Sequence, residues 1–249
     1  MSSHAHSFCR WVSSNLFDRN MKPSKRKVIS RSPSHTVRLI HLPHVQSEPV
    51  EADSNPERYF VHIAALYPFI HKIRDQPFTL ELGDKRYTPD FLLEFKDGSR
   101  LVVEVKPESR MKEYQELFIK AAAKLSANGY GFLVAKDIDI TRDDLASRAL
   151  RIRRYCKTSF NAQACKRVLR IVESSKRGVA MSELIQVHRI NQEVILHLIG
   201  YHQLCTNNNL SIDDRAIVKS TKKLKQEIAN EYQSYAIHFG SWFDTQERA

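Results

Sequence analysis

The sequence predicts an α/β fold: a mixed β-sheet flanked by helices, followed by a smaller and mostly helical domain. Residues 91–106 read as two mostly apolar strands around a Lys96-Asp97-Gly98 turn, which is typical of a β-hairpin. A helical stretch at 109–127 and an apolar strand at 130–135 come next, so the second hairpin strand and residues 130–135 are expected to be parallel neighbours. After Asp137 the apolar spacing becomes helical, which indicates a second domain.

The composition indicates a folded protein with a polyanionic partner. The chain has 249 residues, 42% of them hydrophobic, and a formal net charge of +11. An excess of positive charge of this size suits nucleic acid. No apolar run reaches the length of a membrane span or of a signal-peptide core, so we expect a cytoplasmic protein. The cysteines form no CxxC pair, which argues against a structural zinc site.

Four regions are expected along the chain. Residues 1–46 are predicted to be a basic, flexible arm, because Lys and Arg stand there among Ser and Pro. Such an arm is either disordered throughout or becomes ordered along a DNA backbone. Residues 47–140 hold the α/β domain, residues 141–218 the helical domain, and residues 219–249 a basic and aromatic tail.

Helix starts are predicted from capping residues. Ser54 or Asn55 can cap a helix whose first turn contains Pro56 and Glu57, and Pro68 stops or bends it. Ser109 is expected to cap the helix after the hairpin. Thr141 and Asp144 are expected to form a capping box for the first helix of the second domain.

The hairpin carries the candidate site. If Gly98 forms a left-handed bulge, Phe91 pairs with Val103, and Asp90 then faces Glu104. Lys106 lies on the same face as Glu104, because strand side chains alternate. Two facing carboxylates need a proton, a cation or water between them, and a hard divalent ion such as Mg²⁺ or Mn²⁺ suits their oxygens. Such an ion activates water for attack on a phosphodiester.

The bland interpretation of this site is a solvated charge pair at a strand end. Glu-Val-Lys alone favours that interpretation, because such tripeptides are common. Pro89-Asp90, a turn, and then Glu104-x-Lys106, all in the expected strand context, favour a functional site.

The second domain is predicted to have the element order of a winged helix, with three helices and a hairpin. Its recognition helix, Gln192 to Gly200, offers Gln192, Glu193 and His197 but no Arg or Lys, so docking of a protein is slightly favoured over reading of DNA. One helix face is basic, and contact with phosphates and plain solvent exposure are equally open for its residues: Arg148, Arg151, Arg153, Arg154 and Lys157.

Pro89-Asp90 and Glu104-Val105-Lys106 resemble the motif of the PD-(D/E)xK nuclease superfamily. With the preceding "SNPERYF", residues 50–140 look like the nuclease domain of the TnsA-like endonucleases. The resemblance implies a restriction-endonuclease-like core and a Mg²⁺-dependent DNA endonuclease in which Mn²⁺ substitutes. It implies that Glu57, Asp90 and Glu104, with the Val105 carbonyl, hold the metal. It also implies that Lys106 positions the attacking water.

The same resemblance implies a bacterial protein that nicks double-stranded DNA at the 5′ ends of a transposon. Its implied partners are TnsB, a transposase subunit of the DDE class, and TnsC, a AAA+ regulator. Three alternatives stay open: a stand-alone restriction or repair nuclease of the same fold, an inactive DNA-binding scaffold, and a transcription regulator that uses only the winged helix. The last of these leaves the first domain unexplained.

Overall fold

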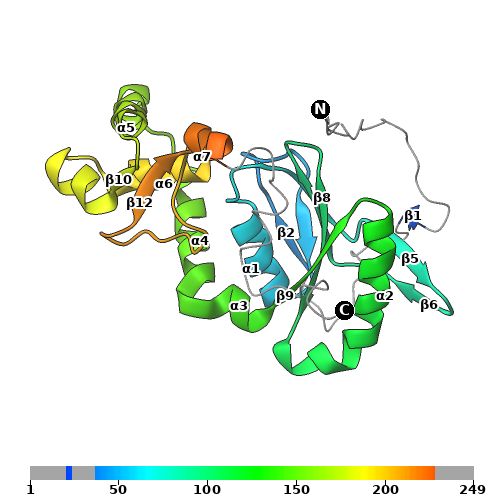
Figure 1. Ribbon diagram of the computed structural model, residues 1–249. Helices are drawn as coiled ribbons and strands as arrows, with labels where there is room; N and C mark the ends of the chain where they lie inside the picture. Colours follow the sequence, from blue (N-terminus) through cyan, green and yellow to red (C-terminus); the bar gives the residue numbers. More distant parts are fainter. Residues whose placement is uncertain (1–20, 24–36, 228–249) are drawn as a thin grey trace, which may run out of the picture.

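A four-stranded mixed sheet forms the centre of the molecule, as the computed structural model shows for residues 21–23 and 37–227 (Figure 1). Its strands lie in the order β4-β7-β8-β9, where β8 and β9 are parallel and the other neighbours are antiparallel. Helices cover both faces, so the predicted α/β fold with a sheet between helices is confirmed. The strands are β4 (Ile70–Asp75), β7 (Phe91–Phe95), β8 (Arg100–Lys106) and β9 (Gly131–Lys136).

The two faces of the sheet have separate cores. Helix α1 (Asn55–Ala64) packs on the face that carries Leu101, Val103 and Val105. Helix α2 (Met111–Ala127) packs on the opposite face, against Val102 and the residues that alternate with the first set. The alternation along β8 therefore decides which side chains lie under which helix.

The predicted hairpin register is confirmed. Phe91 pairs with Val103 and Leu93 with Leu101, and the Phe95 amide donates to the Ser99 carbonyl at 3.0 Å. Gly98 has φ +86°, a conformation that glycine adopts without steric cost. This bulged turn fixes the register that places Asp90 beside the end of β8.

Helix α1 begins as predicted. The Ser54 hydroxyl accepts from the Glu57 amide at 3.2 Å and donates to Glu57 Oε1 at 2.8 Å, so Ser54 caps the helix and Glu57 bonds back to it. The other two cap predictions are wrong. Ser109 lies inside a short 3₁₀ turn before α2, with no capping bond. Thr141 ends α3 (Asp137–Thr141), where its hydroxyl donates to the Asp137 carbonyl at 2.9 Å instead of capping the next helix.

Smaller sheets flank the central one. Strands β1 (Met21–Pro23), β5 (Phe78–Leu82) and β6 (Lys85–Tyr87) form one, and β2 (Arg38–Ile40) pairs with β3 (Val50–Ala52). Both β1 and β2 come from the expected arm, and Ile40 and Leu42 are buried in the core. The basic composition of this region concealed these pairings. The rest of the expected arm, residues 1–20 and 24–36, lies outside the described residues.

The C-terminal region has helices followed by a hairpin, and in addition a strand, β10, and a last helix, α7, that the sequence did not predict; its short strands form a sheet in the order β10-β12-β11. Its assignment as a winged helix stays a prediction. Residues 228–249 of the expected tail lie outside the described part of the chain. None of the described helices combines the length and the apolar character that crossing a bilayer requires. The elements are α4 (Leu145–Tyr155), α5 (Ala162–Ser174), β10 (Val179–Ala180), a π-helical turn (Glu183–Val187), α6 (Gln192–Gly200), β11 (Leu204–Cys205), β12 (Ile217–Ser220) and α7 (Thr221–Glu227).

Helix α6, the expected recognition helix, packs against α4 (Figure 1). Six of its nine residues are buried. The Gln192 side chain accepts from Arg151 at 2.7 Å and donates to the Ile212 carbonyl at 2.9 Å. His197 Nδ1 donates to the Tyr155 carbonyl at 2.9 Å. Gln192 and His197, two of the three side chains that could have contacted DNA bases, therefore form hydrogen bonds within the protein.

The basic face expected on α4 is smaller than predicted. Arg153 is on the buried side of α4, and only 6% of its surface is exposed. Arg148 donates to the carbonyls of Asp143 and Asn209, which tie it to neighbouring loops. Arg154 and Lys157 are exposed.

Candidate active site

Three of the predicted site residues lie together at the ends of β7 and β8. Asp90 immediately precedes β7, and Glu104 and Lys106 belong to β8. Since Leu101, Val103 and Val105 point toward α1, Glu104 and Lys106 point toward the face covered by α2. The hairpin register therefore converts a separation of fourteen to sixteen residues in sequence into a single cluster.

Glu104 is the buried centre of this cluster, with 3% of its surface exposed. Its Oε2 atom accepts from the Tyr87 hydroxyl at 2.7 Å, and its Oε1 atom lies 2.7 Å from Lys106 Nζ. A buried carboxylate is costly unless both oxygens find partners, and here each oxygen has one. Glu104 is thereby held in one orientation.

Asp90 is fixed by the backbone of β8. Its Oδ2 atom accepts from the Val105 amide at 2.8 Å, and its own carbonyl accepts from the Gln76 amide at 2.8 Å. The pKa of Asp90 is raised to about 7, first by burial and then by the neighbouring Glu104 carboxylate, while Lys106 and the Val105 amide lower it. Burial and the second carboxylate thus both disfavour the charged form of Asp90.

Lys106 is the cationic member of the cluster. Burial lowers its pKa, but the carboxylates of Glu104 and Asp90 outweigh burial, so its pKa lies above the ordinary value. Its ammonium also lies 5.5 Å from the centre of the Tyr114 ring, over the ring face. Lys106 is consequently charged at neutral pH and held between two acids and an aromatic ring.

Glu57 is not brought into this cluster. Its carboxylate accepts from the Asp53 amide at 2.9 Å and from the Ser54 hydroxyl at 2.8 Å, so both oxygens complete the cap of α1. Helix α1 packs on the sheet face opposite to Glu104. Glu57 makes only the smallest contribution to the raised pKa of Asp90. Within residues 21–23 and 37–227, no group of three or more His, Cys, Asp or Glu side chains suits a metal ion.

Asp90 and Glu104 themselves fit a hard divalent cation. Both are oxygen donors, and each carboxylate oxygen retains a further lone pair beyond the bond it already accepts. After burial, the Glu104 carboxylate is the main cause of the raised pKa of Asp90, and a cation between the two acids would offset this repulsion. The backbone of Val105 is adjacent, since its amide already contacts Asp90.

Tyr87 is a site residue that the sequence reasoning missed. Its hydroxyl reaches Glu104, and burial followed by the Glu104 charge raises its pKa well above the ordinary range. It therefore stays protonated and donates. The available signal was its place in Tyr87-Thr88-Pro89-Asp90, as the aromatic residue that alternation turns inward at the end of β6.

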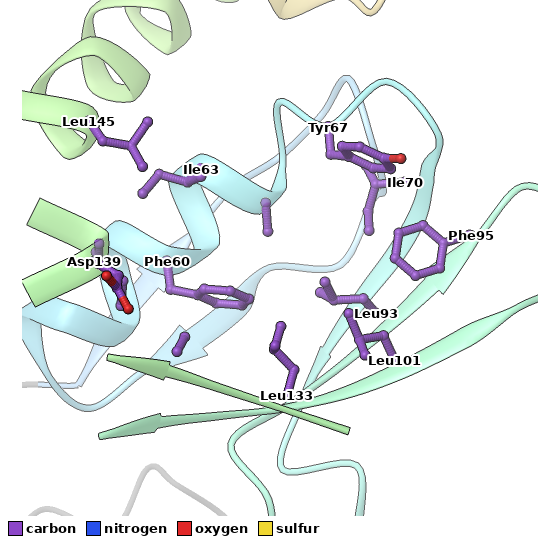
Figure 2. Close-up of a pocket in the computed structure, with 13 residues that line it drawn as sticks. Phe60, Ile63, Tyr67, Ile70, Leu93, Phe95, Leu101, Leu133, Asp139 and Leu145 are labelled. Atoms are coloured by element: carbon purple, nitrogen blue, oxygen red, sulfur yellow. The ribbon is translucent and has the colours of Figure 1, made fainter. Parts of the chain in front are cut away.

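An apolar cavity of about 50 Å³ lies elsewhere, between α1 and the sheet (Figure 2). Figure 2 shows Phe60 and Ile63 on one side and Leu93, Leu101 and Leu133 on the other. Asp139 is the one charged side chain in its lining. The cavity is on the face opposite to Glu104 and offers no chemistry for a phosphodiester.

Residues 67–136 match the sequence family described as the N-terminal domain of TnsA-like endonucleases. The matched segment contains Asp90, Glu104 and Lys106, together with Tyr87, and it ends with β9. Glu57 lies before it. No curated protein matches the chain.

Proposed function

Since residues 67–136 form a TnsA-like endonuclease domain, we propose that this chain is the metal-dependent DNA endonuclease subunit of a cut-and-paste transposase. In this role it nicks the 5′ ends of the transposon during excision. The observation that carries the proposal is the cluster that the buried Glu104 forms with the half-buried Asp90 and Lys106 inside the matched segment. Two acids and a lysine at neighbouring strand ends suit hydrolysis of a phosphodiester.

We assign Asp90 and Glu104 as metal ligands, with Mg²⁺ as the ion and Mn²⁺ as its substitute. When bound, such an ion supplies activation of water and stabilisation of negative charge on the phosphate. Asp90 is held for this role by the Val105 amide, and Glu104 by the Tyr87 hydroxyl. The Val105 carbonyl is assigned as a further ligand.

Lys106 is assigned the positioning of the attacking water. Its ammonium lies 2.7 Å from Glu104 Oε1, so it stands beside the ligands without taking a ligand position itself. A charged lysine there donates to the water and balances the negative charge that develops on the phosphate oxygens. Glu57 takes part only if its carboxylate leaves the cap of α1, where it now bonds to Asp53 and Ser54.

The proposed partners are double-stranded DNA at the transposon ends, the DDE-class transposase TnsB and the AAA+ regulator TnsC. The net charge of +11 supports the DNA partner. The packing of α6 against α4 supports a C-terminal region that docks on protein, because Gln192 and His197 are already bonded to protein groups. A cytoplasmic, bacterial location follows from this function.

One observation favours an inactive DNA-binding scaffold as the second candidate. The Glu57 carboxylate is committed to a helix cap, so the described residues do not assemble three acids around one point. No such observation favours a stand-alone restriction or repair nuclease. The cleavage test below also distinguishes that alternative from a transposase subunit.

The test is cleavage of an end-labelled transposon-end duplex in Mg²⁺, resolved for each strand, with and without the partner transposase subunit. We expect cuts on the 5′ strand only when the partner is present, and none with Asp90→Ala. Asp84→Ala is the matched control, because Asp84 is an exposed acid in the turn between β5 and β6. Cleavage without the partner would indicate a stand-alone nuclease. No cleavage in Mg²⁺ or Mn²⁺ with the partner present would indicate the scaffold.

A further inference from the structure

Helices α1 and α4 pack against each other, and basic side chains lie along the seam between them. Arg58 and His62 stand one turn apart on α1, whereas Arg153 lies in the last turn of α4 and Lys157 lies two residues beyond the end of that helix. Figure 1 shows the two helices side by side, next to the sheet. The electrostatic neighbours of His62 are Arg153, Arg58 and Lys157, so the four side chains converge. We call this group the seam cluster.

The seam cluster contains buried donors without acceptors. Arg153 is 6% exposed, and only its Nη2 atom donates, to the His41 carbonyl at 2.8 Å. The Nε and Nη1 atoms of Arg153 are buried and have no hydrogen-bond partner among the described residues, and the same holds for Arg58 Nε and His62 Nδ1. Buried donors are rarely left unpaired, so their presence in one place indicates an acceptor that residues 21–23 and 37–227 do not supply.

The seam cluster also lacks a compensating negative charge. Within the described ranges, no carboxylate forms an ion pair with any of the four side chains. The pKa of His62 is lowered to about 3, first by burial and then by the charges of Arg153, Arg58 and Lys157, so His62 is neutral. Burial likewise lowers the pKa of Arg153. Three cations are thus held together in a partly desolvated place, an arrangement that an anion would relieve.

We propose that the seam cluster binds a phosphate group of the DNA backbone. Arg, Lys and His are the side chains that donate to phosphate oxygens, and here they point to one place from two helices. Lys157 is exposed and Arg58 half-buried, so the cluster reaches solvent at that side. The choice of DNA as the source of the phosphate rests on the proposed function.

The first test uses inorganic phosphate as the probe. Thermal unfolding is followed in phosphate and in chloride at equal ionic strength, without divalent metal. We expect phosphate to raise the melting temperature of the wild-type protein above its value in chloride, because the folded seam binds it. Lys157→Gln should lose most of that rise. Arg154→Gln is the matched control, since Arg154 is an exposed basic residue three positions before Lys157, and it should keep the rise.

Arg153→Met separates a binding role from a structural one. Replacing an uncompensated buried charge by an apolar side chain should raise the melting temperature in chloride, and the phosphate-induced rise should vanish. A purely structural arginine would instead give a lower melting temperature after substitution. If this variant fails to fold, the comparison of Lys157→Gln with Arg154→Gln still decides the proposal.

The second test measures DNA affinity by fluorescence anisotropy at several salt concentrations, in EDTA so that cleavage plays no part. Lys157→Gln should weaken binding and reduce the slope of log affinity against log salt by about 1, whereas Arg154→Gln leaves the slope unchanged. If Lys157→Gln and Arg154→Gln give equal salt slopes, the seam cluster does not bind DNA. If phosphate still raises the melting temperature in that case, the result indicates an acidic protein partner. If phosphate does not raise the melting temperature at all, the seam cluster is not an anion site. Because neither readout depends on cleavage, failure here is distinct from failure of the proposed nuclease activity.

Discussion

Substitution of Gly200 by Ala tests how tightly α6 is docked on α4. A Cβ at Gly200, the last residue of α6, would overlap the Sγ atom of Cys156 and come within 3.7 Å of Ile152. Two effects oppose each other. Removing a glycine from a helix stabilises by roughly 0.5–1 kcal/mol, whereas overpacking a buried contact costs about 1–3 kcal/mol. We therefore expect Gly200→Ala to destabilise the protein by about 1–2 kcal/mol.

The sign should invert when the obstructing sulfur is removed. In a Cys156→Ala background the overlap disappears, so adding Gly200→Ala should be neutral or stabilising by up to about 1 kcal/mol. The coupling between the two sites would then be about 1–3 kcal/mol, well outside the error of additivity for distant sites. Cys165→Ala is the matched control, because Cys165 is a half-buried thiol on α5, and Gly200→Ala should stay destabilising in that background.

The assay is urea unfolding followed by circular dichroism, with the thermal midpoint as a second readout. At this chain length a loss of 1–2 kcal/mol corresponds to a fall in melting temperature of roughly 2–8 °C. An equal loss in the Cys156→Ala and wild-type backgrounds would refute the reasoning, since Gly200 would then not pack against that sulfur. It would also make DNA recognition by α6 an open alternative again.

Three further predictions concern the buried polar groups. Burial lowers the pKa of His202 to about 4, so the folded state keeps it neutral while the unfolded state takes up a proton below about pH 6.5. Stability should be full above pH 6.5 and fall by about 2 kcal/mol by pH 5, and urea midpoints against pH should decline less steeply in His202→Gln. Tyr87→Phe removes the donor to Glu104 and should lower the free energy of unfolding by about 1.5–3 kcal/mol in urea titrations, so an unchanged midpoint would argue against that hydrogen bond. Lys106→Ala should keep DNA affinity but lose single-turnover cleavage, and unaltered cleavage would remove Lys106 from the mechanism.

Several features of the fold were predictable because they depend on local chemistry. The start of α1 follows from Ser54 and Glu57, which bond to each other within one turn. The register of the hairpin follows from Gly98 and from the alternation of β7 and β8. Asp90, Glu104 and Lys106 could therefore be placed together before any coordinates, since a fixed register determines which side chains share a strand end.

The sequence by itself thus determined the α/β order, the hairpin and the three-residue cluster at its end. Tertiary structure decided what depends on packing between distant segments. It placed α1 across the sheet from Glu104, which leaves Glu57 in its helix cap, and it brought Tyr87 from β6 to the buried carboxylate. It also buried Arg153 beside α1. No local pattern encodes these contacts, because they join residues that are distant in the sequence. These residues come together only when the helices pack on the sheet.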